Sequence, residues 1–222
     1  MFGDSKSEFL SEDSKKLNIG KTYLKIGLFD KARAAFQELK NSFECGNLAN
    51  LGIQLCDLKI KDIELEDDIQ VYEAIQNKAI ATNDVVAFEK AYKEIAKLNG
   101  GYVIEEELLA GILDKFNLCT ALIDVELKKF VERFANSYMY YNLLDHVASG
   151  LIEKNMFYRA RYYVDKAIEV NPHDPKAFFN RLLMKVQSAN EKELINIETN
   201  LDTFEDFNTI LMLCETDEER LK

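Results

Sequence analysis

The chain has 222 residues, of which 47% are hydrophobic and 30% are charged, and this balance is typical of a folded protein rather than a disordered one. Its formal net charge of −11 repels phosphate backbones and anionic lipid surfaces, which argues against binding to nucleic acid or to membranes. Only two Pro and nine Gly are present, and the scarcity of these turn residues favours an all-α fold without significant β-sheet.

The N-terminal half shows the spacing of three and four residues between apolar side chains that predicts amphipathic helices. After a polar tail, the first helix is expected to begin near Ser11 or Ser14 and to continue to an interruption at Gly27. Asn83 and Asp84 suit a turn that also caps the helix after it. The helices predicted in this half are 15–26, 29–39, 48–58, 69–81 and 85–98, with a charged connection at 59–68.

The C-terminal half begins after Asn99-Gly100-Gly101, which predicts a helix end and a subdomain boundary. A further helix start is predicted at Asp174, the N-cap, with Pro175 in the first turn. The helices predicted in this half are 104–116, 120–135, 137–153, 157–170, 176–187, 191–201 and 204–213.

These elements divide the chain into four parts. We expect a mobile N-terminal tail at 1–13, a helical-hairpin region at 14–99, a C-terminal helical region at 102–214 and a frayed C-terminus at 215–222. The C-terminal region contains a distinct hairpin at 142–172.

Residues 17–36 carry small and aromatic side chains in a regular order on two consecutive predicted helices. Gly20 and Ala32 are small enough to let the helices approach closely, whereas Tyr23 and Phe36 fill the remaining space. Gly27 falls between the helices, where it relaxes the backbone of the turn. These features predict a tight αα-hairpin.

This pattern resembles a divergent tetratricopeptide repeat (TPR), and the resemblance covers about residues 15–40 and 142–172. In the second stretch, Leu151 stands where the family often has Tyr, and Asn155 replaces the Gly of the turn. The other matching positions of the second stretch are Ala148, Phe157, Ala160, Ala167 and Pro172.

The resemblance implies antiparallel helical hairpins that stack into a right-handed superhelix, an α-solenoid. It also implies that a peptide or helix of a partner protein binds in a groove formed by the first helix of each hairpin. The candidate groove residues on these helices are Asn18, Lys21, Lys25, Asn142 and Asp145. The alternative is a generic α-helical bundle whose hairpins only look repetitive.

Aromatic residues gather in the C-terminal half as adjacent pairs, which cannot all face one narrow apolar stripe of a helix. Some of them are therefore expected to face a partner, where Tyr and Phe are common anchors. The candidates are Tyr140, Tyr141, Tyr162 and Phe179. The alternative is a thick core of stacked layers.

No motif in the sequence predicts a catalytic, cofactor or metal site. His146 is expected to be partly buried and His173 exposed, and neither belongs to a metal-binding pattern. The acidic runs at 64–68 and 105–107 could bind a cation or a basic partner, or could simply be solvated helix starts. The four cysteines form no CxxC pair and are expected to be reduced and mostly buried: Cys45, Cys56, Cys119 and Cys214.

The sequence therefore predicts a non-catalytic protein-interaction module that acts as an adaptor, scaffold or specialised chaperone and needs no cofactor. One alternative is a structural, self-assembling subunit of a homo-oligomer or larger complex. Another is an enzyme with an acidic site at 64–68, which would have to bind a divalent metal. No apolar run approaches the 18 residues of a membrane span, and no secretory signal is evident, so a cytoplasmic location is expected.

Overall fold

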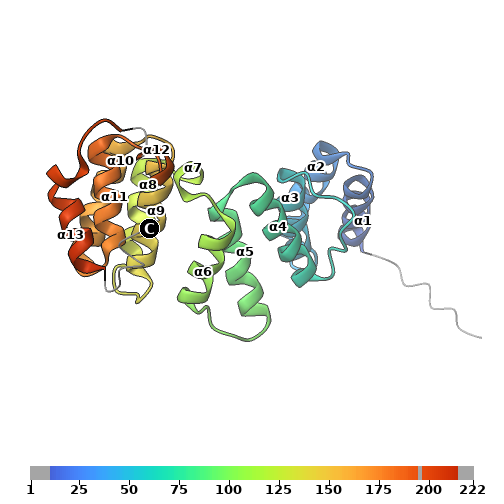
Figure 1. The fold of residues 1–222 in the computed structure, drawn as a ribbon. Coiled ribbons are helices and arrows are strands. Elements are labelled where there is room, and N and C mark those ends of the chain that lie inside the picture. Colours follow the sequence, from blue (N-terminus) through green and yellow to red (C-terminus); the bar gives the residue numbers. More distant parts are fainter. Residues whose placement is uncertain (1–10, 195–196, 215–222) are drawn as a thin grey trace, which may run out of the picture. The chain divides into compact units, whose positions relative to one another are not determined.

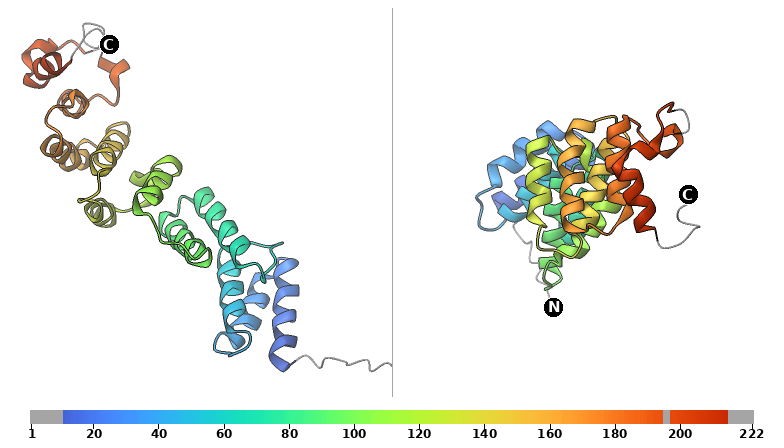
Figure 2. Two further views of the ribbon diagram at one scale, coloured as in Figure 1. Left: turned by 90° about the horizontal axis from the view of Figure 1, so that it is seen from below. Right: turned by 60° about the vertical axis from the view of Figure 1, so that its left-hand side comes forward.

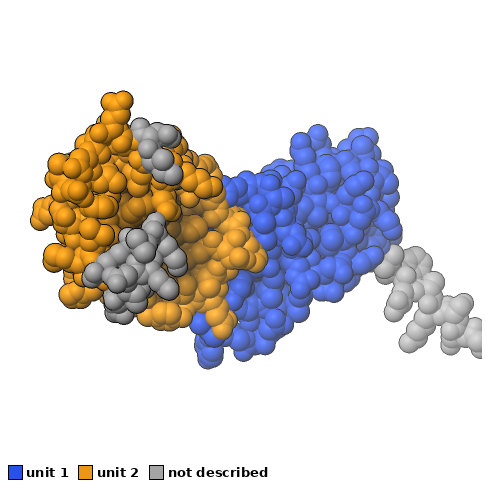
Figure 3. Space-filling model, viewed as in Figure 1, with its two compact units in different colours: residues 1–104 blue, residues 105–222 orange. Residues whose placement is uncertain are grey.

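The computed structural model of the chain describes residues 11–194 and 197–214, and this part is entirely helical, without a strand (Figure 1). Its contacts divide the chain into two compact units at the bond between Ile104 and Glu105 (Figure 3). The division falls just after Asn99-Gly100-Gly101, where the sequence predicts a boundary. Residues 1–10 of the tail expected at 1–13, and the frayed end expected at 215–222, lie outside the described residues.

Unit 1 is built from consecutive antiparallel helices, as the apolar spacing predicts. Their bounds are α1 Glu12–Lys25, α2 Phe29–Leu39, α3 Gly46–Asp57, α4 Asp68–Thr82 and α5 Val85–Leu98. The Ser11 side chain accepts a hydrogen bond from the Ser14 backbone N–H at 3.1 Å, so α1 begins there and not after residue 13. Helix α1 packs on α2, α2 on α3, and α4 on α5.

The core of unit 1 is centred on Phe36, whose side chain is fully buried. A Cβ atom added to Gly20 or to Gly52 would lie only 2.5 Å from its ring. The ring is therefore held between α1 and α3, and both glycines are needed for the close approach of these helices. This confirms the predicted roles of Gly20 and Phe36 and adds Gly52, which the sequence did not single out.

Tight turns close the hairpins in both units. Gly27 has a φ of +76° and Asn155 a φ of +57°, so both lie in the left-handed region that Gly and Asn adopt most readily. After each of them, a backbone N–H closes the preceding helix: Leu28 donates to the Tyr23 carbonyl, and Met156 to the Leu151 carbonyl, both at 2.9 Å. Asn155 thus takes the part of the turn Gly, as predicted.

Unit 2 contains three long helices, α9, α10 and α11, which lie side by side in both further views (Figure 2). Its elements are α6 Glu105–Lys115, α7 Leu118–Ala121, α8 Asp124–Arg133, α9 Tyr140–Ile152, α10 Phe157–Val170, α11 Pro175–Val186, α12 Glu191–Leu194, a 3₁₀ turn Leu201–Thr203 and α13 Glu205–Leu213. Asp174 caps α11 by accepting a hydrogen bond from the Lys176 backbone N–H at 2.9 Å, as predicted.

Two predicted helices of unit 2 are wrong in part. The helix expected at 120–135 is broken because Leu122 and Ile123 are extended, and Glu126 accepts a hydrogen bond from the Ile123 N–H to start α8. The helix expected at 191–201 ends at Leu194, and residues 197–200 are not helical. There the Asn200 side chain accepts from the Asp202 backbone N–H at 3.1 Å, a local bond that competes with helix formation.

Candidate functional site

Helix α9 has two faces of opposite character. One face is fully buried and apolar, with Leu143, Leu144, Val147, Ala148 and Leu151. The other carries four polar side chains at spacings of four, three and four residues, so that they form one stripe along the helix. This stripe, called here the α9 stripe, consists of Asn142, His146, Ser149 and Glu153, and it lines a cavity of about 670 Å³.

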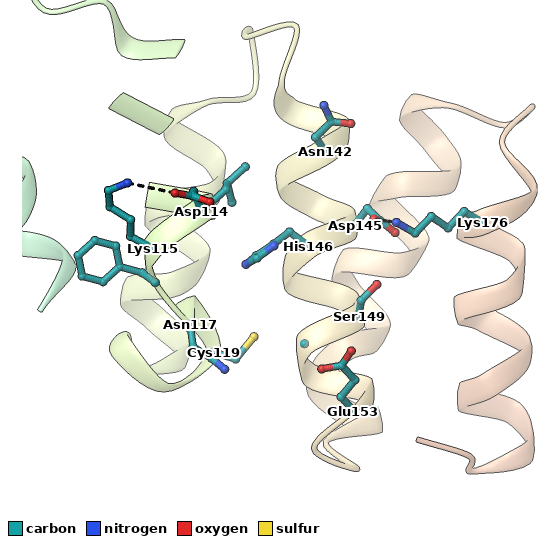
Figure 4. A pocket seen from close by; sticks show the side chains of 13 residues that line it. Asp114, Lys115, Asn117, Cys119, Asn142, Asp145, His146, Ser149, Glu153 and Lys176 are labelled. Atoms are coloured by element: carbon teal, nitrogen blue, oxygen red, sulfur yellow. Dashed lines mark hydrogen bonds and ion pairs between the residues drawn. The ribbon is translucent and has the colours of Figure 1, made fainter. Parts of the chain in front are cut away.

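The opposite wall of this cavity comes from α6, α7 and the residues between them. Asp114, Lys115, Asn117 and Cys119 line it there, while the His146 ring points from α9 towards this wall (Figure 4). Lys115 donates a hydrogen bond to the Asp114 carboxylate at 3.0 Å. The cavity is therefore bounded by polar groups on both sides.

A second cavity of about 470 Å³ continues the first along α11. Ser149, Glu153 and Lys176 line both cavities, whereas Phe179 and Leu183 give the second one an apolar wall. The two cavities together are called here the α9 groove. It joins a polar part beside the α9 stripe to a partly apolar part beside α11.

A polar network holds α11 against α9 at the groove. The buried Asp145 carboxylate accepts a hydrogen bond from the Asn180 amide at 3.0 Å and forms an ion pair with Lys176 at 2.6 Å. The same Asn180 amide donates to the Ser149 hydroxyl at 3.3 Å. Both Asp145 oxygens are thus engaged within the protein, which is what a buried carboxylate requires.

Unlike the Asp145 carboxylate, three side chains of the α9 stripe are not engaged by other described residues. Within the described ranges, the side chains of Asn142, His146 and Glu153 make no hydrogen bond or ion pair with another residue. Their amide, imidazole and carboxylate groups face the cavity, where they can bind a ligand without first breaking an internal contact.

In unit 1, the structure brings Lys21 and Lys25 together at a separate cavity of about 440 Å³, lined by α1 and by residues 62–66. Lys21 forms an ion pair with Glu66 there. Asn18 is exposed on the same helix but does not line this cavity. The connection between α3 and α4 therefore engages Lys21 on the expected groove face of α1, whereas Asn18 and Lys25 remain exposed.

The predicted aromatic anchors have different environments. Tyr140 is only 8% exposed, and its hydroxyl donates to Glu132 at 3.3 Å, so its ring cannot serve as an exposed anchor. The half-buried Tyr162 also donates a hydrogen bond to Glu132. Burial is the main cause that raises the pKa of the Tyr162 hydroxyl, and this hydrogen bond is the second. Tyr141 is half-buried, and its pKa is raised chiefly by burial. Among the four candidates, only Phe179 lines the α9 groove.

Among the described residues of unit 2, the most exposed aromatic side chains were not among the candidates. Tyr158 is 94% exposed and Tyr138 is 82% exposed. Adjacent aromatic residues indicate that one ring of a pair must face outward, but the helix rotation that decides which one depends on packing between helices.

The cysteine thiols are shielded from solvent. All four cysteines are free and buried. Burial is the main cause that raises the pKa of Cys56 to about 11, and it also raises the pKa of Cys119 at the edge of the groove. Both thiols are therefore protonated near neutral pH. The described residues contain no group of three His, Cys, Asp or Glu side chains placed to hold a metal ion.

The sequence singled out Asn142 and Asp145 as groove candidates and Phe179 as a partner-facing aromatic residue, and all three line the α9 groove; it did not single out Ser149, Glu153, Lys176 or Asn180. The spacing of the α9 stripe could have identified Ser149 and Glu153, because polar residues at 142, 146, 149 and 153 follow the helical period. Lys176 and Asn180 come from another helix, and their position follows only from the packing of α11 on α9.

None of the described helices is long and apolar enough to cross a membrane. Searches against protein-family models, curated proteins and solved structures find no match to this chain. The α9 groove is therefore the feature of this chain that bears on its function.

Proposed function

We propose that the protein is a non-catalytic interaction module of stacked TPR-like hairpins, arranged as a right-handed superhelix, and that it binds a segment of a partner protein in the α9 groove. One observation carries this proposal: the α9 stripe presents to a cavity three polar side chains that pair with no other described residue, Asn142, His146 and Glu153. Polar groups in a concave surface that have no internal partner are suited to hydrogen bonding with a ligand.

The dimensions of the groove support a peptide ligand. The α9 stripe extends over 11 residues of helix, or about 16 Å at 1.5 Å per residue. An extended peptide advances about 3.3 Å per residue, so roughly five residues would lie along the stripe. Phe179 and Leu183 at the second cavity would contact an apolar side chain of the same segment.

The polar network beneath the groove favours a preorganised site. Asp145, Asn180 and Lys176 fix α9 and α11 to each other through hydrogen bonds and an ion pair. A surface that is already ordered loses little conformational entropy when it binds, which improves affinity. Asp145 is accordingly a positioning residue rather than a ligand contact.

Affinity capture from a native lysate, with mass spectrometry, tests the proposal. The variant Asn142→Arg/Glu153→Arg alters two members of the α9 stripe and should reduce capture of the specific partners at least tenfold. The matched control is Asn136→Arg/Glu169→Arg, which makes the same change of charge at exposed positions outside the groove. Equal capture by both variants would contradict the proposal.

Self-assembly is the second candidate function, and the exposed rings of Tyr138 and Tyr158 favour it. Large exposed aromatic side chains are typical anchors of protein interfaces. Light scattering after size-exclusion chromatography separates the two candidates. A stable oligomer that dissociates on Tyr158→Ser substitution would support self-assembly, whereas a monomer would support the module.

A further inference from the structure

The connection between α3 and α4, residues 59–67, lies against α1 before α4 begins (Figure 1). Its residues 62–66 share the lining of one cavity with Lys21, Thr22, Leu24 and Lys25 of α1. The Lys61 side chain comes within 3.9 Å of the position that a Cβ atom would take on Gly27. This segment, called here the strap, therefore lies beside the C-terminal half of α1, where Thr22 and Lys25 remain exposed.

Apolar and acidic residues alternate where the strap contacts α1. Leu65 is 2% exposed and belongs to the core of unit 1, and Ile63 packs against the same core. Glu64 and Glu66, in between, are exposed. This alternation places Ile63 and Leu65 against the core, while the chain bends at Asp62 and turns at Leu65 and Glu66, where the Asp67 N–H donates to the Glu64 carbonyl at 3.3 Å.

Charge also holds the strap on α1. Lys21 forms an ion pair with Glu66, and the hydrogen bond from Lys21 is the main cause that lowers the pKa of Glu66. Lys25 lines the same cavity, yet its side chain makes no ion pair or hydrogen bond within the described ranges. One of the two cations is therefore still available to a carboxylate.

The strap fits this face imperfectly. A cavity of about 440 Å³ remains where it meets α1. Two of its non-glycine residues have a strained left-handed backbone, Lys59 with a φ of +55° and Asp62 with a φ of +63°. The ring of Phe36 packs directly between Gly20 and Gly52, so the contact between α1 and α3 does not depend on the strap.

We infer that this face of α1 is an interaction surface for an acidic segment with apolar residues two positions apart, and that the strap occupies it in cis. A partner segment with the same pattern and one more carboxylate would pair with both Lys21 and Lys25. Such a segment would displace the strap and release the left-handed backbone at Asp62. This surface belongs to unit 1 and does not depend on the α9 groove.

Peptide binding to the full chain tests the inference. The probe is a fluorescein-labelled synthetic peptide with the sequence of residues 60–68, Ile-Lys-Asp-Ile-Glu-Leu-Glu-Asp-Asp. The variant Leu65→Ser loosens the strap in the protein, and fluorescence anisotropy should give a Kd at least tenfold lower than for the unchanged protein. Equal or absent binding by a folded Leu65→Ser variant would overturn the inference.

Charge exchange identifies the binding face. Adding Lys21→Glu to the loosened variant should weaken binding of the peptide at least tenfold, and a peptide with Lys in place of Glu66 should restore it. The matched control is Lys40→Glu, an exposed lysine on another part of unit 1 that does not line this cavity. Equal effects of Lys21→Glu and Lys40→Glu would show non-specific attraction and contradict the assignment.

Hydrogen exchange of the unchanged protein keeps the inference testable if Leu65→Ser prevents folding. The Ile60 N–H, which donates to the Leu55 carbonyl at 2.9 Å, and the other strap amides should exchange at least tenfold faster than the amides of α2. If the strap amides and the α2 amides exchanged at the same rate, the strap would open only when unit 1 unfolds. That result would contradict the inference. If the loosened variant formed a dimer, this face would bind a second copy of the chain. That result would overturn the inference of a separate partner.

Discussion

Helices α1 and α9 are each the first helix of a hairpin, but their polar faces are used differently. In unit 1 the strap lies beside α1, and Glu66 already pairs with Lys21. In unit 2 the α9 stripe faces a cavity, and in the part of the chain that the structure describes only Ser149 among its four members is hydrogen-bonded to another side chain. Similar hairpin sequences therefore do not imply similar accessibility, because a connection far along the chain can occupy the face that the helix presents.

The largest expected effect on stability comes from a substitution in the core of the first hairpin, compared with the same position in the second hairpin. Phe36→Ala should lower the free energy of unfolding by about 3–5 kcal/mol, because it removes a fully buried ring and leaves a cavity between Gly20 and Gly52. Val164 is the buried side chain at the same place in the second hairpin, and Val164→Ala removes far fewer atoms. Urea denaturation followed by circular dichroism should show the larger loss for Phe36→Ala, and equal losses would contradict this account of the core.

The network below the α9 groove should give the next largest effect. Asp145→Ala leaves the buried Asn180 amide without its carboxylate acceptor and removes the partner of Lys176. A loss of about 1–3 kcal/mol is expected from the unsatisfied polar group. The control is Asn142→Ala, at an exposed position without an internal side-chain bond, which should change stability by less than about 0.5 kcal/mol. Thermal denaturation of the two variants measures the difference.

Substitutions at the two turns should change stability by different amounts. Gly27→Ala forces a residue with a Cβ atom into a backbone of φ +76° and should cost about 1 kcal/mol. Asn155→Gly relieves the same conformation at φ +57° and should have a smaller effect, within about 0.5 kcal/mol of the unchanged protein. Destabilisation of similar size by both substitutions would show that packing, rather than backbone conformation, determines the residue at these turns.

These features could be predicted from the sequence to different degrees. The hairpin at Gly20 to Phe36 was predictable, because its small residues, aromatic residues and turn lie close together in sequence and obey the helical period. The opposing Gly52 was not, because its contact with Phe36 depends on how α3 packs. The break after α7 was missed, since neither Leu122 nor Ile123 is a residue that normally interrupts a helix.

The candidate site was predictable only along one helix. Asn142 and Asp145 could be placed on the first helix of a hairpin, but the sequence did not distinguish the exposed Asn142 from the buried Asp145. That difference arises because Asn180 and Lys176 approach from α11 and engage the carboxylate. In unit 1 the face of α1 was expected to be open, since a charged connection such as residues 59–67 normally stays in solvent.

The smallest expected effect concerns the ion pair that joins the strap to α1. The pKa of Glu66 is lowered in the folded protein, so the pair stabilises the fold above the ordinary glutamate pKa of about 4.5, and this contribution is lost as the pH falls through the lowered value. The Glu66 side chain is more than half exposed, so solvent screening limits the contribution to about 0.5 kcal/mol. Lys21→Ala should therefore be slightly less stable than the unchanged protein at pH 7, and the difference should disappear near pH 3 and in 1 M salt. A difference that persists under both conditions would mean that the aliphatic part of Lys21, rather than its charge, holds the strap on α1.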